Sequence, residues 1–122
     1  MFKLVKIELG RINVPEPEYH VASVAVEPGM ALTLSAGKLA KASGKPAFVA
    51  LGAAKVDETV AVGRVTPDCV YEVAASASLA AINVGDKVTV NSDALQITAT
   101  TTSGVATIVN KLGDQLALVR FE

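Results

Sequence analysis

The sequence contains one histidine and one cysteine, the side chains most often used in nucleophilic and metal chemistry. His20 lies close to Glu18, and no nucleophile accompanies it in the local sequence, although the members of a Ser-His-Asp triad need only meet in space. We expect His20 to be a solvated or hydrogen-bonded structural residue and Cys69 to be a buried thiol. A Cys/His zinc site lacks ligands, so we expect no metal, no cofactor and no catalytic residue.

Three other patterns come close to a ligand site and fail. The carboxylates of Asp57 and Glu58 would point to opposite faces of an extended chain. Glycines and lysines in residues 37–46 have the wrong spacing for a phosphate loop, and Pro46 stands where Ser or Thr is needed. Residues 84–88 read Val-Gly-Asp-Lys-Val, which is similar to the opening of biotinyl and lipoyl carrier domains, but no lysine follows in the setting those carriers modify. We therefore do not expect an enzyme.

The totals of the sequence restrict the partners and the compartment. The chain has 122 residues, the size of one domain, and a formal net charge of −1 at pH 7, with its eleven Lys and Arg residues spread along it. We expect no nucleic-acid partner, since there is no basic run. No segment has the length of a signal-peptide core or a membrane span, so we expect no membrane partner. A single cysteine is typical of a protein made in a reducing compartment such as a bacterial cytoplasm. Hydrophobic residues reach 51%, and we expect partners or sister subunits to cover part of that surplus.

Short apolar runs separated by turn residues are typical of β-hairpins. Helix is predicted only as an alternative for residues 53–56 and 74–82, the second of which is Ala-rich. We predict a mainly β fold, a small barrel or sandwich domain of short hairpins. The expected strands are 20–26, 30–34, 38–42, 47–51, 59–66, 69–73, 87–90, 95–99, 105–109 and 115–121.

The first eighteen residues differ from the rest. Residues 2–9 mix apolar and charged side chains in partial alternation, and the following Pro15-Glu16-Pro17-Glu18 breaks any regular element. We predict an extended arm with a Pro-rich linker over residues 1–18 and one β domain over residues 19–122. The alternative is a first strand that packs in the domain's own sheet.

A shift of 56 residues superposes two parts of the chain without gaps. It pairs Gly29 with Gly85 and Arg64 with Arg120, and it keeps the apolar residues in phase. Such a duplication would give two similar β units, with the two arginines near equivalent strand ends. Coincidence in an Ala- and Val-rich chain is the other explanation.

Three stretches spread over most of the chain occur in a recognisable order. They are Val14-Pro15-Glu16-Pro17-Glu18-Tyr19, Gly37-Lys38-Leu39-Ala40-Lys41-Ala42, and the tail from Asn83-Val84-Gly85-Asp86-Lys87-Val88 through Thr100-Thr101-Thr102-Ser103-Gly104-Val105-Ala106 to Val119-Arg120-Phe121. In this order and at this length, the sequence resembles the head-decoration, or capsid cement, proteins of tailed bacteriophages, especially phages of clostridia and their relatives.

The resemblance implies a β-tulip or related barrel on the outer surface of the virion head. The module would bind the major capsid protein and stabilise its shell, as a trimer at local threefold axes or as a monomer. An N-terminal arm could attach to the capsid by adding a β-strand to it. The arm residues expected to bind the capsid are Phe2, Leu4, Ile7, Leu9, Ile12, Val14, Pro15 and Pro17.

The alternative function is a free-standing β-barrel that binds a ligand such as a glycan or a tail component. Glycan sites usually present exposed aromatic rings. We expect Phe48 and Tyr71 to belong to the core, because each lies in an apolar strand pattern.

Overall fold

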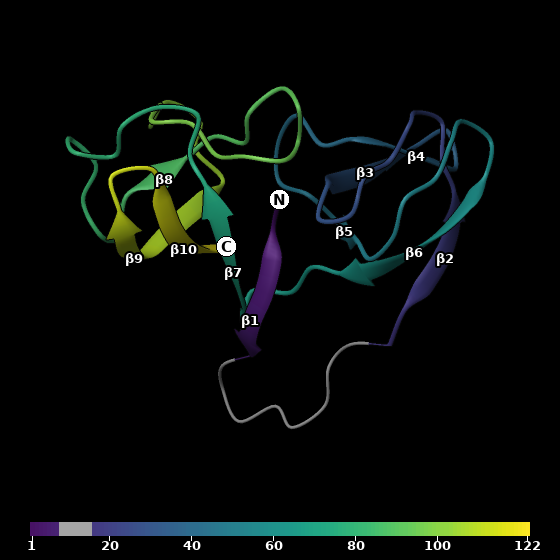
Figure 1. Ribbon diagram of the computed structural model, residues 1–122, viewed down its shortest axis with the longest axis horizontal. Helices are drawn as coiled ribbons and strands as arrows, with labels where there is room; N and C mark the ends of the chain where they lie inside the picture. The colour runs from purple at the N-terminus through teal and green to yellow at the C-terminus, as the bar shows by residue number, and fades with distance from the viewer. Residues whose placement is uncertain (8–15) are drawn as a thin grey trace.

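Ten β-strands and their connecting turns make up residues 1–7 and 16–122, which are the residues that this computed structural model describes. They form two five-stranded antiparallel sheets that lie side by side (Figure 1), with the orders β1-β7-β10-β9-β8 and β2-β6-β5-β3-β4. The predicted mainly β fold is confirmed. The strands are β1 Lys3–Ile7, β2 Glu18–Val21, β3 Ala31–Ser35, β4 Lys38–Lys41, β5 Phe48–Ala50, β6 Thr59–Arg64, β7 Cys69–Ala74, β8 Lys87–Val88, β9 Ala106–Gly113 and β10 Leu116–Phe121.

The two segments considered as helices are not helical. Residues 53–56 lie in a turn and in an isolated bridge at Ala54. Ala74 ends β7, and the residues after it form a loop held to the core by Leu79 and Ile82, which are both buried. A short helix is unfavourable because forming its first turn fixes the backbone angles of several residues and gains only one hydrogen bond. Within the described ranges, no helix is long and apolar enough to cross a membrane.

The two sheets repeat one strand order. When β2 is matched to β7, β6 to β10, β5 to β9 and β3 to β8, the matched strands follow one another in the same sequence across each sheet. A parallel bridge occurs at a similar place in each half: it joins Ala22, just after β2, to Leu39 of β4 in one half, and Ala75, just after β7, to Ile97 in the other. Beside these bridges, the Ser23 N–H donates to the Leu39 carbonyl at 2.9 Å, and the Ser76 N–H donates to the Ile97 carbonyl at 2.8 Å. The structure therefore supports the duplicated architecture.

The ungapped shift is wrong in the last strand of each half. Val62 pairs with Glu18 on β2, and its counterpart on β10 is Val119, which pairs with Tyr71 on β7. The offset here is thus 57 residues, and this offset aligns the buried positions of the two strands, whereas an offset of 56 does not. A one-residue slip turns side chains to the other face of a sheet. Arg120 therefore corresponds to Gly63 and not to Arg64.

β1 is an addition to the repeat. It is the outermost strand of the first sheet and pairs with β7, Lys3 opposite Glu72 and Leu4 opposite Tyr71. The Phe2 N–H donates to the Gly29 carbonyl at 2.8 Å, so the start of the chain is bound to both halves of the molecule.

One apolar cluster contains buried residues from both sheets. The predictions that Phe48 and Tyr71 belong to the core and that Cys69 is buried are confirmed. At one end of the core, the Phe2 ring lies with its centroid 5.4 Å from that of Phe121 and 6.5 Å from that of Tyr71. The largest fully buried side chains are Phe2, Phe48, Phe121, Leu32, Leu39, Leu79, Ile97 and Ile108.

Candidate functional site

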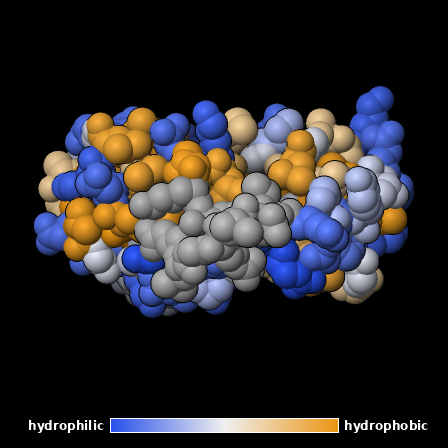
Figure 2. All heavy atoms as spheres, turned by 90° about the horizontal axis from the view of Figure 1, so that it is seen from below, coloured by the Kyte–Doolittle hydropathy of each residue, from blue (hydrophilic) through white to orange (hydrophobic). Residues whose placement is uncertain are grey.

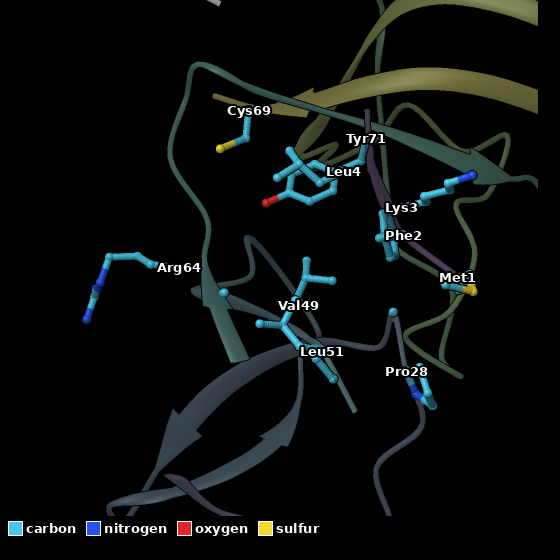
Figure 3. A pocket seen from close by; sticks show the side chains of 13 residues that line it. Met1, Phe2, Lys3, Leu4, Pro28, Val49, Leu51, Arg64, Cys69 and Tyr71 are labelled. Carbon is cyan, nitrogen blue, oxygen red and sulfur yellow. The ribbon is translucent and has the colours of Figure 1, made fainter. Parts of the chain in front are cut away.

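A cleft of about 300 Å³ lies at the junction of the two halves. β1 and β7 form one wall, and β5 and the end of β6 form the other. Figure 3 shows Leu4 and Tyr71 on one side, facing Val49 and Leu51 on the other, with Met1 and Phe2 toward one end. The walls are therefore mainly apolar, and they come from segments that are far apart in the sequence.

Gly63 lines the cleft and, because it has no side chain, leaves space beside one of its walls. A Cβ built on this residue would make only ordinary contact, 3.8 Å from Leu51 Cδ2, and its backbone does not adopt the left-handed region. Neither packing nor conformation therefore requires a glycine here. Glycine inside a strand weakens it and often marks a place where a ligand or another backbone approaches closely. At the corresponding position, the second half carries Arg120.

The open edge of β1 borders the same cleft. Successive residues of an antiparallel strand turn their N–H and C=O groups to opposite sides. Phe2 turns its N–H away from β7, to the Gly29 carbonyl at 2.8 Å. Leu4, two residues further along, therefore turns its N–H and C=O in that direction, away from β7.

Arg64 lies at the other end of the cleft and is held in place by two neighbours. Its guanidinium donates to both carboxylate oxygens of Glu18, at 2.7 and 3.0 Å, and its Cζ lies 5.0 Å from the centroid of the Phe48 ring. The Arg64 hydrogen bond is the main cause that lowers the pKa of Glu18, and it raises the pKa of Arg64. His20 Nε2 lies 3.4 Å from Glu18, which agrees with the predicted structural histidine.

Replacing Glu18 by glutamine should lower the Tm modestly at pH 7 and not at acid pH. The pKa of this carboxyl is lower in the folded protein, so its ion pair stabilises the fold above the unfolded pKa of about 4.5 and is lost as pH falls through the folded value. Thermal unfolding of both proteins between pH 7 and about pH 3 measures the effect. Glu27→Gln, on an exposed residue, serves as the control. A Glu18→Gln deficit that is equal at both ends of the range would contradict this assignment.

The predicted capsid-binding residues have separate locations. Phe2 is only 2% exposed, Leu4 is half-buried beside the cleft, Ile7 ends β1, and Pro17 is exposed just before β2. Residues 2–7 are thus not a detached arm, so the arm predicted over residues 1–18 does not include them. Their alternative placement, a strand in the protein's own sheet, is the one observed, because Phe2 packs against Phe121 and Tyr71. Leu9, Ile12, Val14 and Pro15 lie outside the described residues.

Polar groups near the cleft are few. The Cys69 thiol is buried, 3.1 Å from Thr66 Oγ1, and burial is the main cause that raises the pKa of Tyr71. Across residues 1–7 and 16–122, no group of three or more His, Cys, Asp or Glu residues could hold a metal ion. Our reading of the sequence missed Gly63 and the Glu18–Arg64 pair. A lone glycine within the strand pattern of residues 59–66 was the available signal for the first.

Tyr19 is the one aromatic side chain that is exposed among the described residues, at 68%. Phe2, Phe48, Tyr71 and Phe121 are each 3% exposed or less. Exposed aromatic rings are the usual feature of a glycan site, and Tyr19 is the ring that this surface offers. In the face seen in Figure 2, apolar side chains gather mainly over the half with the first sheet, and hydrophilic ones are more frequent on the other half.

Comparisons with known proteins identify a similar fold. No protein-family model matches the sequence, and no curated protein matches it. Among solved structures, the chain is similar to the head fiber gp8.5 N base of bacteriophage phi29, with a TM-score of 0.64 and 19% sequence identity. The match covers 88% of this chain and 93% of the other. At this identity, the two chains share a fold.

Proposed function

We propose that this protein is a non-enzymatic component of a bacteriophage head, a decoration protein that binds the outer surface of the shell and stabilises the major capsid protein. The observation that carries the proposal is the fold similarity to a phage head fiber base, which extends over 88% of the chain. The independent resemblance of three sequence stretches to capsid cement proteins supports it.

The architecture is consistent with this role. Two halves with the same strand order lie side by side (Figure 1), so the molecule is suited to contact more than one subunit of a repeating shell. When several contacts act together, the second becomes intramolecular, and weak individual contacts then give strong retention. Such bridging would oppose separation of the shell subunits under internal DNA pressure.

The purified protein should co-sediment with heads of its own phage that lack it, and binding should saturate. Decorated heads should also withstand a higher temperature before they release DNA, since rupture then requires breaking the added contacts. Gradient sedimentation and a fluorescent dye for released DNA measure the two effects, with heads of an unrelated phage as the control. Protein that stays at the top of the gradient, together with a native head reconstruction without external density for it, would reject the proposal.

A further inference from the structure

We propose that the cleft between β1 and the second sheet is a docking groove for an extended segment of the shell protein, which pairs with the open edge of β1 and places a large apolar side chain between Tyr71 and Leu51. This inference rests on the proposed function, and it names the surface and the chemistry of the contact.

The backbone of β1 provides the first argument. β1 is the last strand of its sheet, and the Leu4 N–H and C=O face away from β7. Edge strands with groups of this kind bind extended peptides by main-chain hydrogen bonds, while pockets beside the edge select alternate side chains. Leu4 also lines the cleft, so the edge and the pocket lie together.

The size and walls of the cleft provide the second argument. Its volume of about 300 Å³ is at the lower end of the range for small-molecule sites, which favours an inserted side chain over a whole ligand. Leu51 is 57% exposed and Met1 56% exposed, and both line the cleft, so exposed apolar surface gathers at this place. A partner that covers them gains the free energy of burying apolar surface.

Gly63 is the third argument. A Cβ at this position would meet its neighbours only at ordinary van der Waals distance, yet the residue is glycine, and the open space that results belongs to the cleft. A glycine that weakens its strand without a local need fits a wall that must admit another chain.

The charged residues of the cleft indicate which kind of segment it would bind. The charged residues that line the cleft are Lys3 and Arg64, both cationic, and no acidic residue lines it within the part of the chain that the structure describes. Since Arg64 is already paired with Glu18, Lys3 is the cation that can meet a new carboxylate. We therefore assign to the groove a segment in which an acidic residue adjoins the large apolar one.

Gly63→Leu should fill the groove and weaken binding to undecorated heads by about 30-fold, the effect expected for losing a central anchor contact. Gly44→Leu is the matched control, because Gly44 lies in a turn outside the cleft where a Cβ meets nothing within 4 Å. It should bind like the unmodified protein. Circular dichroism and thermal unfolding check that both variants fold.

A second variant tests the groove from its rim. Leu51→Asp places a negative charge beside the groove on an exposed residue and should also weaken binding, whereas Leu112→Asp, on the exposed end of β9, should not. Hydrogen exchange should show the Leu4 amide becoming protected when the protein is bound to heads, which a structural effect of the substitutions would not produce.

The outcomes separate the two proposals. If the unmodified protein binds heads and both Gly63→Leu and Leu51→Asp bind equally well, or if the Leu4 amide stays unprotected on the head, the groove is wrong and the proposed function stands. If the unmodified protein does not bind heads, the proposed function fails and the groove fails with it. Should Gly63→Leu not fold, Leu51→Asp and the Leu4 amide decide.

Discussion

Replacing Phe2 by alanine should lower the free energy of unfolding by about 3 to 5 kcal/mol, the usual cost of removing a buried aromatic side chain. The ring is 2% exposed and packs against Phe121 and Tyr71. Its loss leaves a cavity where β1 crosses the junction of the two halves. Urea unfolding followed by circular dichroism measures the change, provided that the slope with urea stays constant.

Val5→Ala is the control for this experiment, because Val5 lies on the same strand and is 42% exposed. It should cost less than about 1 kcal/mol, as most exposed positions do. If Phe2→Ala were equally mild, the start of the chain would behave as the detached arm expected from the sequence. A large effect shows that residues near the start belong to the core.

Replacing Gly104 by alanine should destabilise the protein by about 3 kcal/mol, the upper part of the range for overpacking. A Cβ on this residue would overlap the Lys87 carbonyl group and lie 2.8 Å from the Val88 N. The neighbours are backbone atoms of β8, so no side chain can turn aside to relieve the overlap. The Val105 N–H donates to the Val88 carbonyl at 2.9 Å, and separating the two segments would break that bond.

Gly113→Ala is the matched control for Gly104→Ala. A Cβ on Gly113 meets nothing within 4 Å, and the residue is outside the left-handed region. The substitution should leave stability unchanged or raise it by about 0.5 kcal/mol, since alanine reduces the entropy of the unfolded chain. A similar loss in both variants would mean that the cost comes from removing glycine and not from the contact with β8.

Much of the local structure was predictable from the sequence. The runs 38–42, 59–66 and 115–121 each contain an observed strand, and Phe48 and Tyr71 are buried as their strand patterns indicated. Alternation identifies such elements because successive side chains of a strand face opposite sides. The run 95–99 forms only isolated bridges, which join Ile97 to Ala75 and to Val90. A local pattern identifies an apolar run, but it does not specify how far the run pairs with another segment.

The site was much less predictable. The anchoring role of Phe2 depends on Phe121 and Tyr71, which lie far along the chain, and residues 2–7 by themselves are compatible with both a free arm and a strand. The offset between the halves changes along the chain, so an ungapped comparison matched Arg64 with Arg120 when their strands required Gly63. A glycine in a strand pattern is visible in a sequence, but the space beside it is not.

The amino-acid sequence by itself determined the β class, the positions of most strands and the burial of Phe48 and Tyr71, because these follow from alternation and turn residues over a few positions. Only the tertiary structure decided that β1 joins the first sheet, that the two halves share one strand order, and that Tyr71, Leu51 and Gly63 meet in one cleft. Pairing between distant strands depends on which edges and apolar faces fit together in space, and no local pattern specifies that choice.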